Sequence, residues 1–167
     1  VLNHGTSTGS HSGLQANGDG DGVDIDNIAH IENYGTIQGV GAGGVDKGGF
    51  ANGSEGIALG GGYILNAKNA LISGADSAIL VDDGSGNSGL AATTLENFGT
   101  IQGLNGFGVK FVGEFDDNVV NGGTISGSNG LALDLGGGND NLTLRNGSRF
   151  VGVVDGGSGG DQGVMDD

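Results

Sequence analysis

The chain has 167 residues, of which 41 are glycine and none is cysteine or proline, and its net charge is −15. Because phosphate binding requires clustered lysine and arginine, the 5 basic residues against 20 acidic ones exclude nucleic acid and disfavour anionic membrane surfaces. The absence of cysteine excludes disulfides and thiol chemistry. No run of about 18 apolar residues is present, so we expect no direct membrane insertion by this segment.

A first element, with the pattern Asn-x-Gly-Thr-Ile-x-Gly, recurs from the start of the chain to its end. Three copies are clear and three are degenerate; they begin at Asn3, Asn33, Asn66, Asn97, Asn121 and Asn146. Each copy predicts two short strands with a corner at the asparagine. An asparagine tolerates left-handed dihedral angles there, and its amide can hydrogen-bond to the same amide in the next coil. These six asparagines therefore predict an internal ladder.

A second element alternates with the first and carries apolar residues at every second position, which is typical of a strand with one buried face. Its copies begin at positions 22, 56, 78, 108 and 130, in steps of 34, 22, 30 and 22 residues. A basic coil of 22 residues is too short for a helical hairpin repeat. With glycine at the corners, it predicts an all-β parallel solenoid of about six coils, formed by residues 1–167 as a single segment.

Three insertions lengthen this coil, at residues 10–19, 40–53 and 83–92. The first two follow the first element in consecutive coils, so we expect them to lie side by side. Long loops cost a solenoid little, and plain surface loops are one interpretation. Binding is the other, because loops often carry function. The residues of the first pair that favour binding are His11, Asp46, Lys47 and Phe50.

The acidic segment at residues 18–26 raises the question of calcium, because carboxylates alternating with glycine suit a hard cation. The candidate ligands are Asp19, Asp21, Asp24 and Asp26. Solvated turn carboxylates are the alternative interpretation. Asp140 and Asp161 end glycine-rich segments similar to a calcium-binding nonapeptide, but their spacing of 21 residues does not fit tandem nonapeptides. No other cofactor is expected.

Catalysis has little support in the sequence. Ser158 lies in a Gly-x-Ser-x-Gly segment, but a nucleophile elbow needs a strand before it and a helix after it. His4, His11 and His30 do not have the spacing of a zinc site. The outward positions of the second element carry no repeated acidic pair of the kind that polysaccharide-cleaving enzymes use. We therefore expect no enzymatic activity, and a carbohydrate-active β-helix is the alternative.

The first element, together with residues 18–26 and 136–144, resembles the passenger regions of bacterial autotransporters, which are secreted by the type V route. The resemblance covers nearly the whole chain. It implies a right-handed parallel β-helix that is secreted or displayed on the bacterial cell surface, and we expect the chain to be part of a longer passenger. It also implies a structural or adhesive stalk, whose partners are a host or bacterial surface protein, a glycan or further copies of itself. The alternative is a carrier stalk for a protease or esterase domain outside this fragment.

Overall fold

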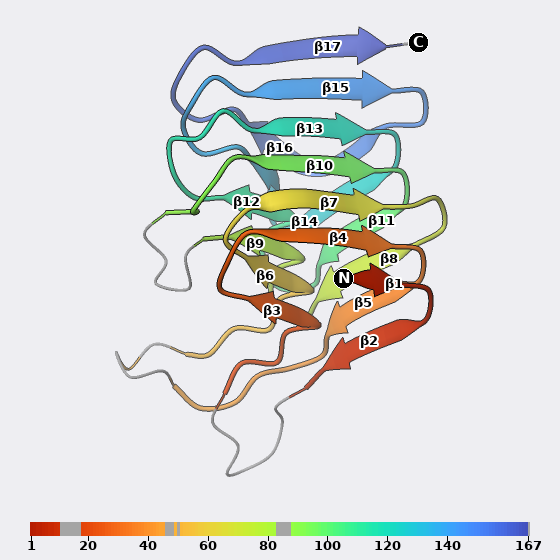
Figure 1. Ribbon diagram of the computed structural model, residues 1–167, viewed down its shortest axis with the longest axis vertical. Helices are drawn as coiled ribbons and strands as arrows, with labels where there is room; N and C mark the ends of the chain where they lie inside the picture. The colour runs from red at the N-terminus through yellow and green to blue at the C-terminus, as the bar shows by residue number, and fades with distance from the viewer. Residues whose placement is uncertain (11–17, 46–48, 50, 83–87, 167) are drawn as a thin grey trace.

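The computed structural model describes residues 1–10, 18–45, 49, 51–82 and 88–166. The described residues form β-strands, turns and irregular segments, and no helix is found among them. Figure 1 shows strands stacked one above another along the long axis, with the N-terminus near one end and the C-terminus at the other. Despite its high glycine content, the chain forms an all-β rod.

One stack is a seven-stranded sheet in which every neighbouring pair of strands is parallel. Its strands, in spatial order, are β1 (Leu2–Asn3), β4 (Ala29–Asn33), β7 (Gly62–Asn66), β10 (Thr93–Asn97), β13 (Asn118–Asn121), β15 (Asn141–Arg145) and β17 (Gln162–Asp166). Neighbours in space are separated by other strands along the chain. The chain therefore leaves this sheet after each strand and returns one step further along the rod.

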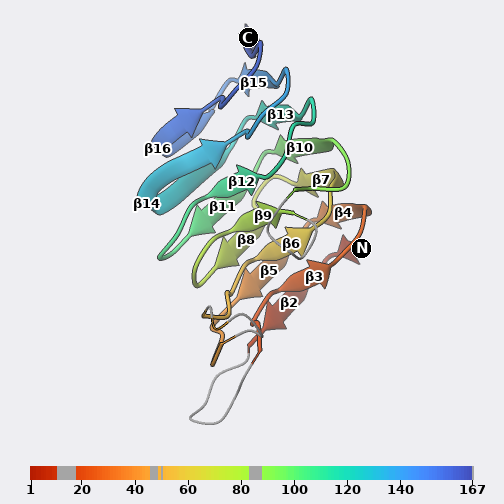
Figure 2. The ribbon, with the colours of Figure 1, turned by 90° about the vertical axis from the view of Figure 1, so that its left-hand side faces the viewer.

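The remaining strands form a ten-stranded parallel sheet, seen in Figure 2. They are β2 (Thr6–Gly9), β5 (Thr36–Gly39), β8 (Leu71–Gly74), β11 (Thr100–Gly103), β14 (Thr124–Asp134), β12 (Val109–Phe111), β9 (Ile79–Val81), β6 (Ile57–Leu59), β3 (Val23–Ile25) and β16 (Arg149–Asp155). The long strand β14 connects two stacks, because Thr124–Gly127 pair with β11 while Leu133 and Asp134 pair with β12. The first and second sequence elements thus occupy separate stacks.

The strand register places equivalent residues of successive sequence repeats opposite each other. Thr100 pairs with Thr124, and Ile101 pairs with Ile125. Both sheets are parallel and all strands stack in this way, which is consistent with a β-helix-like solenoid. The prediction of an all-β parallel fold is confirmed at this level.

The core is a column of apolar side chains inside the rod, produced by the two-residue alternation of the strands. In the first element the inward isoleucines have no exposed surface: Ile37, Ile72, Ile101 and Ile125. Burial of each such side chain is worth about 1.5 to 3 kcal/mol. Burial decreases toward both ends, where Val1 is 53 % exposed and Met165 is 78 % exposed. The middle coils therefore contribute most of the hydrophobic stabilisation.

The last glycine of the first element is required by a close backbone approach. A β-carbon at Gly103 would lie 2.0 Å from the carbonyl oxygen of Phe107, and one at Gly127 would lie 1.9 Å from the carbonyl oxygen of Leu131. Both distances are far below van der Waals contact. The chain turns toward the next strand here, so any larger residue would push the corner open.

Candidate functional site

The asparagines of the first element form a hydrogen-bonded ladder inside the rod. The Nδ2 of each donates to the Oδ1 of the next, at 2.8 Å from Asn3 to Asn33 and 2.9 Å from Asn33 to Asn66. The ladder continues with 2.9 Å from Asn66 to Asn97 and 2.8 Å from Asn97 to Asn121. From Asn33 to Asn121 these side chains are completely buried. Their donors and acceptors are used within the protein, so the ladder is structural.

Further bonds from each ladder amide explain the rest of the sequence motif. The Oδ1 of Asn97 accepts a bond from the backbone N–H of Gly99 at 3.2 Å. Its Nδ2 donates to the backbone carbonyl of Thr124, one coil further on, also at 3.2 Å. Each amide thereby fixes its own corner and joins it to the next coil. A buried amide without hydrogen-bond partners costs free energy. The column therefore favours the strand register in which the asparagines of successive coils lie opposite each other.

Asn146 is not part of the ladder, and its predicted place there was wrong. Leu144 lies opposite Asn121 in the register of β13 and β15, while Asn146 is exposed in the turn after β15. The Nδ2 of Asn121 donates instead to the Oγ of Ser148, at 2.9 Å. Leu142 and Leu144 occupy the inward positions of β15, and this apolar pair sets the register of the strand.

In the acidic segment, two of the four proposed calcium ligands accept backbone hydrogen bonds from the next coil. The Oδ1 of Asp19 accepts from the N–H of Gly53 at 3.2 Å, and that of Asp21 accepts from the N–H of Glu55 at 2.7 Å. These bonds fasten the start of the second element of one coil to that of the next. The two carboxylates thus have structural partners.

The other two proposed ligands, Asp24 and Asp26, are exposed. Burial raises the pKa of Asp24, and Asp26, Asp19 and Asp82 raise it further, so these carboxylates influence one another. In the described part of the chain, no group of three or more acidic or histidine side chains has the arrangement of a metal site. Calcium binding by the four aspartates stays a prediction.

Asp21 and Glu55 are two neighbouring acidic residues, and the sequence analysis does not predict their contact. Burial raises the pKa of Glu55 to about 8, and the nearby carboxylates of Asp21 and Asp76 act in the same direction. Burial also raises the pKa of Asp21, against the lowering effect of the Glu55 backbone bond. The pair therefore holds a proton at neutral pH. Only coil stacking brings these residues together, since they are 34 positions apart.

A second polar column occupies another corner and was also not predicted. Each aspartate accepts a bond from a backbone N–H in the preceding coil: Asp117 from Thr93, Asp140 from Asp117 at 2.7 Å, and Asp161 from Asp140 at 3.1 Å. Burial raises the pKa of Asp117 to about 7. In the sequence, this column is indicated only by the glycine-rich segments that end at Asp140 and Asp161. Their carboxylates fasten coils together through backbone N–H groups.

Aromatic and charged side chains gather on the outward side of β4 and β7 and in the turns that follow β1 and β4. His4 stacks on Tyr34 with ring centroids 4.9 Å apart, and His30 stacks on Tyr63 at 4.7 Å. Glu32 lies between the two stacks, 2.8 Å from the Nε2 of His30 and 3.0 Å from the hydroxyl of Tyr34. We call these five residues the acidic aromatic face. The sequence analysis does not predict this face, because neither the histidine spacing nor the repeat pattern indicates that these five residues lie together.

The bases of the first two insertions pair with each other. Gly18 and Gly43 form an antiparallel bridge, with N–O distances of 2.9 and 3.2 Å. The described flanks of these insertions therefore lie side by side, as the coil register predicted. The four side chains proposed for binding, His11, Asp46, Lys47 and Phe50, lie outside the described residues.

Ser158, in the Gly-x-Ser-x-Gly segment, lies in the connection between β16 and β17 and forms a parallel bridge with Gly137. Its N–H donates to the carbonyl of Gly136 at 3.0 Å. The chain continues from this turn into a strand, whereas a nucleophile elbow continues into a helix. The segment thus serves as a corner that stacks on the corner before it.

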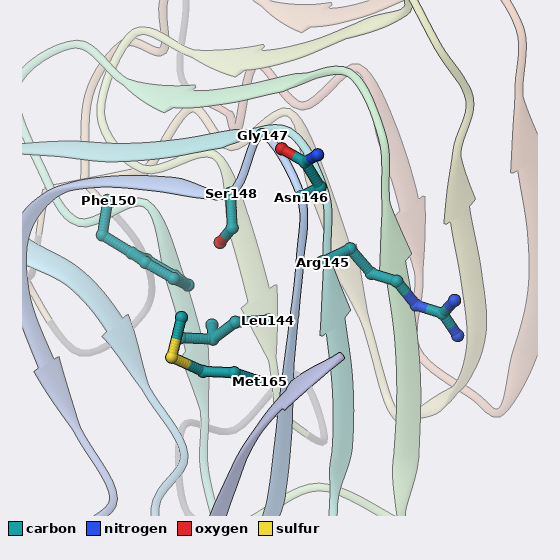
Figure 3. Close-up of a pocket in the computed structure, with 7 residues that line it drawn as sticks. All are labelled: Leu144, Arg145, Asn146, Gly147, Ser148, Phe150 and Met165. Atoms are coloured by element: carbon teal, nitrogen blue, oxygen red, sulfur yellow. The ribbon is translucent and has the colours of Figure 1, made fainter. Parts of the chain in front are cut away.

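A hollow of about 380 Å³ lies at the C-terminal end of the rod, beside β15, β16 and β17. Its lining consists of Leu144, Arg145, Asn146, Gly147, Ser148, Phe150 and Met165. In Figure 3 the side chains of Leu144, Phe150 and Met165 point toward one another, while Arg145 points away. These three occupy inward strand positions, so the hollow is an exposed part of the core. It offers no acid or base for chemistry.

No family model, no curated protein and no solved structure matches this chain. Among the described residues, no helix is long and apolar enough to cross a membrane. The features that bear on function are therefore the rod itself, its internal columns and its outward faces.

Proposed function

We propose that this chain is a non-enzymatic stalk segment of an autotransporter-like surface protein, with a structural and adhesive role. In this proposal the rod is a right-handed parallel β-helix of about six coils that lies outside the cell. The observation that carries the proposal is the unbroken asparagine ladder from Asn3 to Asn121, beside fully buried isoleucines. Such columns make a solenoid stable through contacts between neighbouring coils alone.

The distribution of polar groups supports a display role over catalysis. The buried asparagines and corner aspartates accept or donate hydrogen bonds within the protein. Among the described residues, the outside of the rod carries the acidic aromatic face and the adjoining bases of two insertions. Surfaces of this kind bind partners without needing converging acids and bases. The proposed partners are a protein or glycan of a host or bacterial surface, or further copies of the chain.

The test is binding of the purified chain to arrays of glycans and extracellular matrix proteins, alongside hydrolysis assays on polysaccharides, esters and peptides. We expect saturable binding to at least one ligand class and no turnover of any substrate. A variant in which a short glycine linker replaces residues 41–52 should remain folded, because this insertion is additional to the 22-residue coil. Turnover of a substrate would contradict the non-enzymatic role, and absence of binding on both arrays would contradict the adhesive one.

A further inference from the structure

The acidic aromatic face concentrates residue types that are rare elsewhere in the chain. It contains both tyrosines of the protein and two of its three histidines. The outward positions of β5 and β11, by contrast, carry threonine and glutamine. The solenoid can therefore be built without outward aromatic residues. Parallel sheets usually have both faces covered, and this face is partly exposed, with 44 % of Tyr34 accessible.

The charge at the centre of this face is held in a fixed position. Glu32 accepts a bond from the hydroxyl of Tyr34 and is bonded to the ring of His30 on its other side. These two bonds lower the pKa of Glu32, first through His30 and then through Tyr34, and keep its carboxylate ionised. About a third of the Glu32 side chain is exposed. An ordered, accessible carboxylate is thus presented to solvent.

A second carboxylate continues the same row. The register places Glu32 opposite Leu65 and Leu65 opposite Glu96, so the two glutamates are separated by two strand spacings, about 9.6 Å. Leu65 lies between them. The outward positions of β4, β7 and β10 carry no lysine or arginine. The row therefore alternates negative and apolar side chains, beside the two aromatic stacks.

We propose that the acidic aromatic face, extended by Leu65 and Glu96, is a docking surface for a basic, partly apolar peptide segment of a partner protein. Two arginine or lysine side chains about 10 Å apart meet Glu32 and Glu96, and an apolar side chain between them packs on Leu65. In an extended peptide, residues i, i+2 and i+4 lie on one side and span about 13 Å, so Arg-x-Leu-x-Arg places an apolar side chain between two flexible basic ones. The net charge of −15 favours the approach of a basic partner.

The carboxylates favour a basic peptide over a sugar at this site. The interplanar angles are 12° for His4 and Tyr34 and 30° for His30 and Tyr63, so each ring covers one face of its neighbour and leaves the other face for a guanidinium group or a sugar. Glu32 and Glu96 select the cation between these two. Arginine forms bidentate bonds with carboxylates and also packs against aromatic rings. The inference depends on the proposed adhesive function and specifies its partner as a protein.

The test measures binding of a synthetic peptide with repeated Arg-Thr-Leu-Thr by calorimetry at physiological salt. We expect the double variant Glu32→Gln/Glu96→Gln to bind about tenfold more weakly, since each exposed ion pair is worth up to about 1 kcal/mol. The matched control is Asp26→Asn/Glu114→Gln, which removes the same charge at two exposed positions away from the face. Its affinity should stay within about twofold of the parent. Unchanged melting temperatures would show that both variants are folded.

Equal weakening by both double variants, or no binding of the peptide, would overturn the proposal. Binding of a glycan that Glu32→Gln/Glu96→Gln abolishes would also overturn it, because a sugar would then be the occupant. If array binding to a matrix protein persists in that variant, the adhesive function stands while this docking surface fails. The two proposals are thus tested separately.

Discussion

Replacing Asn97 with alanine is expected to lower the free energy of unfolding by about 2 to 4 kcal/mol. The change removes two bonds within the ladder, to Asn66 and Asn121, and two bonds to backbone groups of Gly99 and Thr124. It leaves several of these buried groups short of a partner, at about 1 to 3 kcal/mol for each unsatisfied group. Each kcal/mol corresponds to a shift of about 2 to 4 °C in Tm for a chain of this size.

The matched control is Asn146→Ala, the same chemical change at the copy of the motif that lies outside the ladder. Because Asn146 is exposed, its free energy of unfolding should stay within about 0.5 kcal/mol of the parent. Urea denaturation of the three proteins measures both values. Equal effects at Asn97 and Asn146, or no effect at Asn97, would contradict the structural role of the ladder.

Stability is expected to fall as the pH rises from about 4.5 to about 8. The pKa of Glu55 is raised from 4.5 to about 8 in the folded protein, and that of Asp117 from 3.8 to about 7. Across this interval the folded state keeps protons that the unfolded state has lost. Stability therefore decreases with pH until the folded groups have ionised. Thermal unfolding at a series of pH values measures the trend.

Substituting Glu55 with glutamine should remove part of this dependence. The amide keeps the shape of the protonated carboxyl group and cannot ionise, so Tm at pH 8 should exceed that of the parent. A gain of about 1.4 kcal/mol corresponds to one unit of pKa shift and is a conservative expectation for Glu55. Glu114→Gln, at an exposed corner, serves as the control and should reproduce the parent profile. A parent Tm that is constant between pH 5 and 8 would contradict the prediction.

The asparagine ladder and the carboxyl groups of Glu55 and Asp117 all lie at contacts between coils, and a solenoid derives its stability from such contacts. The asparagine ladder is uncharged and should act at any pH. Glu55 and Asp117, by contrast, lower the stability of the rod once they ionise. A rod displayed outside the cell would therefore unfold at a lower temperature in alkaline than in mildly acidic surroundings.

The repeat, the alternation of apolar residues and most of the ladder follow from the amino-acid sequence alone. In a parallel stack, identical positions of successive repeats lie opposite each other, so a recurring asparagine or isoleucine becomes a column without further information. This is why the sequence aligns Asn33, Asn66 and Asn97 as the strand pairing does. The corner glycines follow from the same periodicity.

Contacts that depend on the strand register at irregular coils become visible only in the three-dimensional structure. Leu144 of β15 lies opposite Asn121, so Asn146 lies outside the ladder. Asn121 donates a hydrogen bond to Ser148 instead. Coil stacking places Asp21 beside Glu55 and the ring of His30 on that of Tyr63. Each pair occupies equivalent positions of successive repeats, 34 and 33 residues apart, but its two members differ in residue type, so no recurring motif marks it. Only strand pairing sets their proximity, because burial of apolar side chains selects the register and the polar groups follow it.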